Sequence, residues 1–567
     1  MSIENKCKIC NNLIGQFGDI KEKRCILHCK KDAWFEKKEL LCGSSNTTTY
    51  IDWNKSSQQT KEFWQKIKEF INEQIDEILF YEIIFPKFEQ INPLKILHGK
   101  MNDGTPTCII TENNLHFWEK GTVRFFDKPV TFMNCTFLGK VDFSHIIFKN
   151  AVNFRNSTFN EIIQINESQF KDQLYFCEDT KINELRIDYS TKINKLKFEN
   201  TNLSNDLFIK SPEINKLEII NNKKINKIRI HDSKINSILM KSNIYINDFI
   251  LKNTIIKGTV NLDLTENKEK ILDNFEINGC TFNDDSFIVI KKVNFNNFLI
   301  IDNDNISGAF CLYDTTIENK IRFEYTDVSN FEFHNCNFEQ VEKKIKIKNV
   351  SFISNNGFTI FNGVKWGNIA KTFDPSTDRD TFRQLKYVNE KQGNIIEANK
   401  FYSAEMKAYK EELKDKKNKH RWQERVVFWL NEKVSNFSQS WILPLAWYSV
   451  FGFLFAFIYY FNSRIFLFQG FISASILLIS IVLFCNDIRE LSDFKKTMKL
   501  LTIISGLNYF MNVPSESLIK LFKFINPFNT SGLDDNDGRL IWWILFRIIS
   551  VFIIYQFIIS LRRQTRR

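Results

Sequence analysis

Between about residues 125 and 366, a large apolar residue, usually Phe, returns every five or six positions. A smaller apolar residue usually stands two places before it, and Asn, Lys, Asp or Glu fill the gaps. This period fits neither the turn of a helix nor the alternation of a flat strand. It predicts a chain that turns a corner about every five residues, so that four short sides close a coil of about twenty residues and the coils stack.

The pattern is clearest in residues 130–161, where successive units read VTFMN, CTFLG, VDFSH, IIFKN, VNFRN and STFNE, and again in residues 276–340. It resembles the pentapeptide-repeat family, whose fold is a right-handed quadrilateral β-helix. Some members mimic duplex DNA and bind gyrase through strongly acidic surfaces. Acidic and basic residues are balanced in this region, so we expect a rigid spacer or protein-binding platform and no nucleic-acid partner.

Two flanking segments have helical spacing. Residues 54–85 alternate apolar residues with Lys and Glu, and Pro86 ends the run, which predicts an amphipathic helix acting as a cap within 54–90. Residues 375–435 predict a helical connector that begins with an antiparallel pair turning at Gly393. Its run LKYVNEKQGNIIEANKFY resembles the helical pair that follows pentapeptide repeats in a set of bacterial membrane proteins.

Apolar runs near the C-terminus predict an α-helical membrane domain. Three of them are long enough to cross about 30 Å of hydrocarbon, and a shorter one is either a fourth span or a re-entrant pore helix. Basic residues before, between and after the runs favour cytoplasmic ends and therefore four spans. The resemblance of the connector implies that the membrane is a bacterial inner membrane. The four runs, in chain order, are 442–461, 465–485, 497–513 (the shorter one) and 540–561, and the basic tail is 562–567.

The last run resembles the terminal helix of the same membrane proteins, some of which are classed with two-helix potassium-type channels. No filter sequence of the TVGYG kind occurs in residues 486–540, so potassium selectivity is not implied. Arg547 either faces a cavity or partner, or extends its side chain to the membrane interface. Gln556 and Asn508 are candidates for pore groups or for hydrogen bonds between helices.

Five of the 12 cysteines fall within the first 42 residues, and no secretory signal precedes them. In a reducing cytoplasm, such clustered cysteines predict a closed, structural zinc site in a module spanning residues 1–45, and the alternative is a set of free thiols. The predicted ligands are Cys7, Cys10, Cys25 and either His28 or Cys29, with Cys42 as a distant substitute.

The formal net charge of +11 gathers beside the apolar runs, as is typical of cytoplasmic flanks of membrane spans. No phosphate-binding glycine loop, nucleophile elbow, zinc-protease motif or calcium loop occurs, so the sequence favours a protein that is not an enzyme. We expect a homo-oligomer in the lipid bilayer. Its cytoplasmic β-helix would sense a signal or bind a protein partner, and it would be coupled to a channel-like or pore-forming transmembrane domain. The alternative is a membrane-anchored protein-binding scaffold without transport activity.

Overall fold

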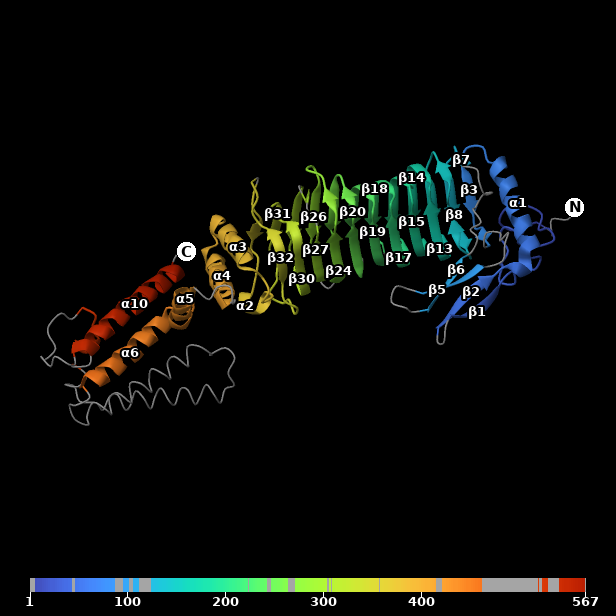
Figure 1. Ribbon diagram of the computed structural model, residues 1–567. Helices are drawn as coiled ribbons and strands as arrows, with labels where there is room; N and C mark the ends of the chain where they lie inside the picture. The colour runs from blue at the N-terminus through green and yellow to red at the C-terminus, as the bar shows by residue number, and fades with distance from the viewer. Residues whose placement is uncertain are drawn as a thin grey trace. The chain divides into compact units, whose positions relative to one another are not determined.

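A computed structural model of the chain (Figure 1) divides into two compact units, Met1–Ser376 and Thr377–Arg567. The structure describes residues 6–42, 46–86, 95–100, 106–111, 124–222, 224–241, 246–263, 271–302, 305–306, 308–355, 357–414, 421–460, 519, 523–528 and 540–565.

The first unit is a β-solenoid built from two parallel sheets whose strands stack coil upon coil (Figure 1). The first sheet contains β4 (Ile84–Phe85), β9 (Thr136–Phe137), β10 (Val141–Asp142), β13 (Thr158–Asn166), β15 (Lys181–Asp188), β17 (Asn202–Lys210), β19 (Lys224–His231), β21 (Asp248–Lys252), β24 (Ile271–Asn278), β27 (Asn294–Ile301), β30 (Thr316–Asp327) and β32 (Lys346–Ser351). The second contains β3 (Ile78–Tyr81), β7 (Arg124–Phe126), β8 (Val130–Met133), β11 (Ile146–Phe148), β12 (Val152–Arg155), β14 (Gln169–Cys177), β16 (Lys192–Glu199), β18 (Glu213–Ile220), β20 (Lys234–Lys241), β22 (Ile255–Ile256), β23 (Thr259–Asp263), β25 (Thr281–Phe282), β26 (Phe287–Lys291), β28 (Asn305–Ile306), β29 (Ala309–Tyr313), β31 (Phe331–His334) and β33 (Ile360–Asn362).

The coil is longer than the twenty residues expected from four five-residue sides. Asn134 and Asn156 occupy equivalent corners of successive coils, 22 positions apart, and their side chains are hydrogen-bonded at 2.8 Å. Both have positive φ angles, 57° and 46°, a backbone conformation that Asn tolerates better than most residues. Asn134 and Asn156 therefore make the same sharp corner in successive coils. The two additional residues of the coil fall elsewhere, in the six-residue spacings from Phe137 to Phe143 and from Phe148 to Phe154.

Inward-pointing Phe residues form continuous stacks along the solenoid. Phe154, which is fully buried, lies between Phe132 and Phe176 with ring centroids 4.7 and 5.0 Å away. Stacks of this kind contribute about 0.5–1.5 kcal/mol per pair beyond the burial of apolar surface. The repeated Phe of the sequence thus forms the core of the solenoid.

Asparagine ladders run along the outside of the same strands. Asn215 donates to the side-chain oxygen of Asn194 and accepts from Asn236, each at 3.0 Å. Such ladders form where identical side chains stack at strand spacing. The ladders give the many asparagines of this region a structural role that their spacing in the sequence does not reveal.

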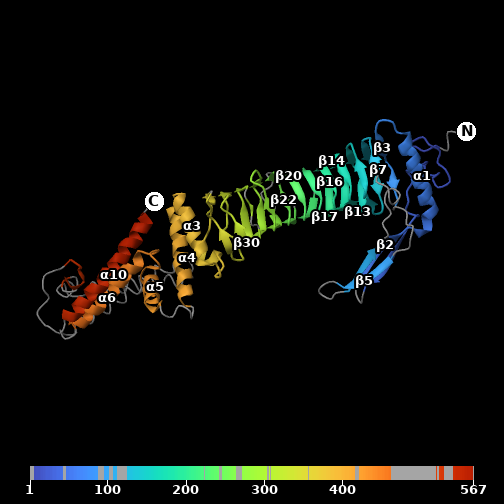
Figure 2. The ribbon, with the colours of Figure 1, turned by 45° about the horizontal axis from the view of Figure 1, so that its top comes forward.

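The N-terminal cap differs from the single helix expected over residues 54–85. Helix α1 (Ser57–Glu73) ends early, and β3 and β4 already belong to the first coil, so the solenoid begins before residue 125. The alternating burial of Ile78–Tyr81 is that of a strand, which the helical spacing of the apolar residues concealed. The cap also contains η2 (Asn54–Ser56) and two hairpins (Figure 2), formed by β1 (Glu36–Cys42) with β2 (Asn46–Asp52) and by β5 (Lys95–Lys100) with β6 (Pro106–Thr111).

Helix α1 covers the open end of the Phe stacks. The ring of Phe63 lies 5.8 Å from that of Phe85, and the ring of Phe70 lies 5.5 Å from that of Phe80. Solenoids need such caps because a terminal coil otherwise leaves its apolar interior exposed. At the other end of this unit, the short helix α2 (Ile369–Thr372) follows the last strands.

The second unit is helical. Helices α3 (Arg379–Lys391) and α4 (Ile395–Lys414) form a pair on either side of Gly393, whose φ of 76° suits glycine. Three more helices are described: α5 (Trp422–Ser435), α6 (Ile442–Tyr460) and α10 (Leu540–Thr565).

Within the described residues, one helix is long and apolar enough to cross a membrane, over Ile541–Arg563. Helix α6 has a shorter apolar stretch, Ile442–Ala456. The predicted spans 465–485 and 497–513 lie outside the described residues, so the expectation of four spans stays a prediction. Helices α6 and α10 and residues 523–525 pack together through one buried apolar cluster. Its members are Phe455, Ala456, Phe524 and Phe546.

Candidate metal centre

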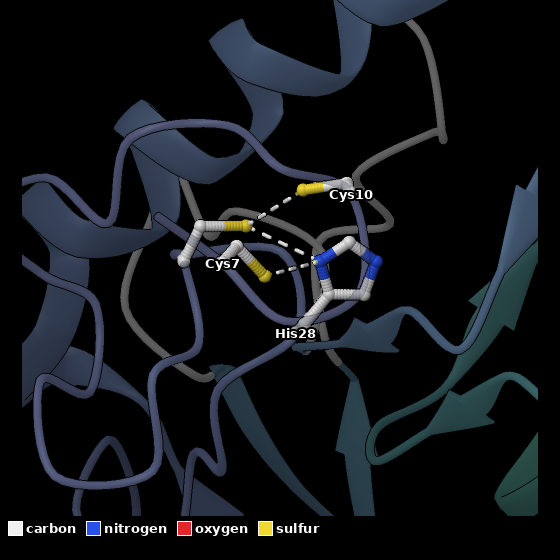
Figure 3. A group of neighbouring side chains, drawn as sticks. Cys7, Cys10 and His28 are labelled. Atoms are coloured by element: carbon white, nitrogen blue, oxygen red, sulfur yellow. Dashed lines mark hydrogen bonds between the residues drawn. The ribbon is translucent and has the colours of Figure 1, made fainter. Parts of the chain in front are cut away.

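Four of the predicted ligands meet in one cluster near the N-terminus (Figure 3), namely Cys7, Cys10, Cys25 and His28. The Cys10 and Cys25 sulfurs are 3.6 Å apart, and His28 Nδ1 lies 3.2 Å from Cys25 Sγ and 3.6 Å from Cys7 Sγ. All four ligand atoms lie within 4.8 Å of one another.

Two short loops bring these side chains together. Cys7 and Cys10 lie on a tight turn closed by the hydrogen bond from Asn11 N to Cys7 O, at 3.0 Å. Gly18, in the segment that joins the two loops, lies close to the backbone on both sides of it: a Cβ atom there would lie 2.4 Å from the carbonyl oxygen of Ile14 and 2.7 Å from that of Arg24. A larger residue at position 18 would therefore displace this connecting segment.

The spacing fits a tetrahedral ion. A zinc ion with sulfur ligands at about 2.3 Å and a nitrogen ligand at about 2.0 Å separates sulfurs by roughly 3.8 Å and sulfur from nitrogen by roughly 3.5 Å. The observed contacts lie near these values. Cys7, Cys25 and His28 are buried, so four protein ligands would close the site and leave no position for a substrate. The cluster is therefore suited to a structural metal.

The second ring nitrogen of His28 lies 3.1 Å from the carbonyl oxygen of Tyr81, in β3. An imidazole that donates from Nε2 to a carbonyl has its lone pair on Nδ1, which is the atom that faces the sulfurs. Ile84 N also donates to Leu27 O, at 3.1 Å. The cluster is thus joined directly to the first coil of the solenoid.

Cys29 lies outside the cluster, so of the two alternatives for the fourth ligand the structure favours His28. Its thiol is directed at the carbonyl oxygens of Ile26 (3.6 Å) and Phe17 (3.7 Å), and burial raises its pKa. By contrast, hydrogen bonds with Cys10 and His28 lower the pKa of the Cys25 thiol. Cys25 and Cys29 differ in side-chain direction, which sequence spacing does not reveal.

Lys31 is a buried cation beside the cluster. It is 1% exposed, and its ammonium donates to the carbonyl oxygens of Cys29 (3.1 Å) and Leu27 (3.4 Å). The ammonium also lies 5.0 Å from the ring centroid of Phe63, and burial lowers the pKa of Lys31 to about 8. Zinc with three thiolates and a neutral imidazole has a net charge of −1, which a buried ammonium would offset. The sequence does not distinguish Lys31 from its neighbour Lys30.

Two of the predicted membrane residues, Arg547 and Gln556, are among the described residues and belong to the second unit. Arg547 donates to the carbonyl oxygen of Pro527 and stacks 4.6 Å from the ring centroid of Trp543. The buried Gln556 accepts from the Ser435 hydroxyl at 3.1 Å, which joins α10 to the end of α5. Asn508 lies outside the described residues.

Comparison with known proteins concerns the solenoid. Residues 132–176 match the family described as pentapeptide repeats, with nine copies. No curated protein and no solved structure matches the chain. The matched residues are those whose Phe side chains form the stacks and whose corners carry Asn134 and Asn156. The first unit of this chain therefore contains a β-solenoid, of which residues 132–176 are pentapeptide repeats.

Proposed function

We propose that this chain is an integral membrane protein of a bacterial inner membrane, with both ends in the cytoplasm. The pentapeptide-repeat solenoid binds a protein partner, and the helical connector passes that event to a channel-like or pore-forming domain. A metal ion bound at the cysteine and histidine cluster stabilises the fold of the N-terminal cap. The assembly is a homo-oligomer, because a pore built from a few helices per chain needs several chains.

The observation that carries this proposal is the contact between the connector and the end of the apolar helix α10. Asn399 of α4 donates to the carbonyl oxygen of Arg563 at 3.0 Å. The Arg563 guanidinium stacks 3.8 Å from the ring centroid of Tyr402 and donates to Phe437 O at 3.3 Å. A displacement of α4 would therefore act directly on the end of α10.

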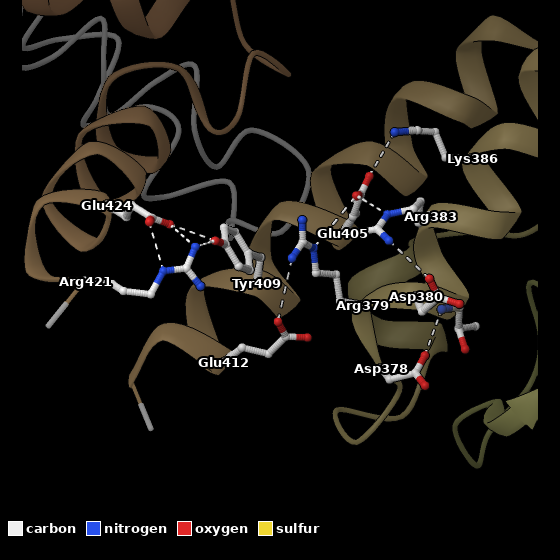
Figure 4. A network of polar contacts seen from close by, with 11 residues as sticks. Asp378, Arg379, Asp380, Arg383, Lys386, Glu405, Tyr409, Glu412, Arg421 and Glu424 are labelled. Atoms are coloured by element: carbon white, nitrogen blue, oxygen red, sulfur yellow. Dashed lines mark hydrogen bonds and ion pairs between the residues drawn. The ribbon is translucent and has the colours of Figure 1, made fainter. Parts of the chain in front are cut away.

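The connector itself is held by a dense ionic network (Figure 4). The carboxylate of Glu405 on α4 is 3% exposed and meets Lys386 at 3.0 Å and Arg383 at 3.4 Å, both on α3. A buried carboxylate with several cationic partners holds two helices in one register, since losing a partner leaves an uncompensated charge. This rigidity supports a role in transmitting displacement.

A second candidate is the membrane-anchored scaffold without transport activity. It is favoured by the local contacts of Arg547, whose guanidinium is engaged by Pro527 and Trp543 of its own unit. An arginine satisfied in this way needs no role in a pore. Under this alternative, the solenoid alone carries the function.

Current recordings from the purified full-length protein in planar lipid bilayers distinguish the two candidates. Discrete currents in planar bilayers, absent from protein-free membranes, are expected from the channel-like protein. The scaffold would instead be established by two results together. No current would appear at any voltage or salt concentration, and a protein partner would be captured by residues 125–366 without residues 442–561.

A further inference from the structure

Helix α5 presents an apolar face that no described residue covers. Trp422 is 60% exposed, Val426 46% and Trp429 52%. Their spacing of four and three residues puts them in one stripe along the helix. Lys433 continues the stripe at its C-terminal end, and its side chain is exposed.

The acidic residues of α5 are turned away from this stripe, toward α4. Glu424 accepts from the Tyr409 hydroxyl at 2.7 Å and from Arg421 at 2.6 Å. Glu432 is paired with Lys410 of α4. The outward face consequently combines indole and valine side chains with a lysine and no carboxylate, which is the composition of helices that lie in a membrane interface.

The position of α5 relative to α10 and α6 is fixed by polar contacts at its C-terminal end. Ser435 is hydrogen-bonded to Gln556, and the Trp447 indole donates to Lys433 O at 2.9 Å. Helix α10 itself carries an exposed apolar stripe, which includes Ile548 (64%), Val551 (70%), Tyr555 (58%) and Ile558 (56%). The C-terminal end of α5 thus lies against a helix whose exposed stripe would face lipid if α10 spans the membrane.

We propose that α5 lies in the cytoplasmic membrane interface, with Trp422, Val426 and Trp429 among the lipid headgroups. Lys433, together with the exposed Arg562 of α10, gives this region a preference for anionic lipid. This inference rests on the proposed membrane span of α10. Burial of Trp side chains at headgroup depth is favourable because the indole is apolar over most of its surface and has one polar N–H group.

The test uses full-length protein in vesicles of phosphatidylcholine and phosphatidylglycerol, with an environment-sensitive fluorophore attached to one introduced cysteine. The test position is Val426→Cys on α5, and the matched control is Glu411→Cys at an exposed side chain of α4. A third variant, Val551→Cys, places the probe on α10. Each variant is compared with labelled wild type. Spin-labelled lipids with the nitroxide near the headgroup are expected to quench the probe at position 426 at least threefold more than the probe at position 411. Replacing phosphatidylglycerol with phosphatidylcholine is expected to reduce that quenching.

Equal quenching at positions 426 and 411 would overturn the inference. Disulfide cross-linking between two copies through position 426 would also overturn it, because the stripe would then face another chain. Quenching at 426 that is independent of the anionic lipid would overturn the lipid preference. The Val551→Cys probe separates this inference from the proposed function. If lipids labelled deep in the acyl chain quench position 551 but position 426 stays unquenched, the span stands and only the interfacial helix fails.

Discussion

His28 and Tyr81 are joined by a hydrogen bond between the imidazole Nε2 and a backbone carbonyl, 3.1 Å long, that connects the metal cluster to the first solenoid strand. A bound ion would therefore hold the cap onto the solenoid as well as fold the N-terminal loops. Because a small module with little core gains its stability from metal, the cap and the first coil should lose order together when the ion is removed.

The ligand set is tested by two neighbouring cysteines. Cys25→Ala should abolish stoichiometric zinc binding, whereas Cys29→Ala should retain it, because of these two cysteines Cys25 has its sulfur beside His28 and Cys29 has its sulfur directed at backbone carbonyls. Metal content by atomic emission and the sulfur-to-cobalt charge-transfer band of the cobalt-substituted protein measure this. One zinc per chain in Cys25→Ala, or none in wild type, would exclude the site.

Lys31 should increase the zinc affinity of the same centre without contacting the ion. Replacement of the buried ammonium in Lys31→Met should lower zinc affinity by about tenfold, as changes around the ligands of a metal commonly do. The adjacent Lys30→Met is the control, since the Lys30 side chain is 63% exposed. Competition with a chromophoric chelator gives both affinities, and equal values would show that the charge of Lys31 does not act on the metal.

The Phe stack should dominate the stability of the solenoid. Phe154→Ala removes a fully buried ring between two others and should lower the free energy of unfolding by about 3–5 kcal/mol. Phe287→Ala, at a ring that is 40% exposed, should cost much less. Denaturant unfolding followed by circular dichroism compares them, and similar losses would contradict the inward packing.

Glu405 should hold the connector together. Glu405→Gln leaves three cations around a neutral amide and should destabilise the α3–α4 pair by on the order of 3 kcal/mol. Glu411→Gln removes an exposed pair with Lys414 and should change stability by well under 1 kcal/mol. Hydrogen exchange of residues 379–414 measures both, and equal protection in the two variants would rule out the network as the support.

The sequence predicted those features that repeat. The period of Phe132 and Phe154 was enough to predict stacked coils, and the spacing of Cys7 and Cys10 was enough to predict a metal-binding loop. It could not predict features set by three-dimensional neighbours. Ile78 fitted the preceding helical spacing although it begins a strand, and the burial of Lys31 depends on Phe63, which is distant in sequence.

Single-channel recording of Arg563→Ala beside Arg562→Ala tests the central claim most directly, which is that the connector acts on the membrane helices. Arg563 contacts Tyr402 and Phe437, whereas Arg562 is exposed on the same turn. We predict that wild type and Arg562→Ala give the same currents, and that Arg563→Ala changes the open probability severalfold while leaving the unit conductance unchanged. Identical gating in all three proteins, or no current from any of them, would contradict the coupling of the connector to a pore.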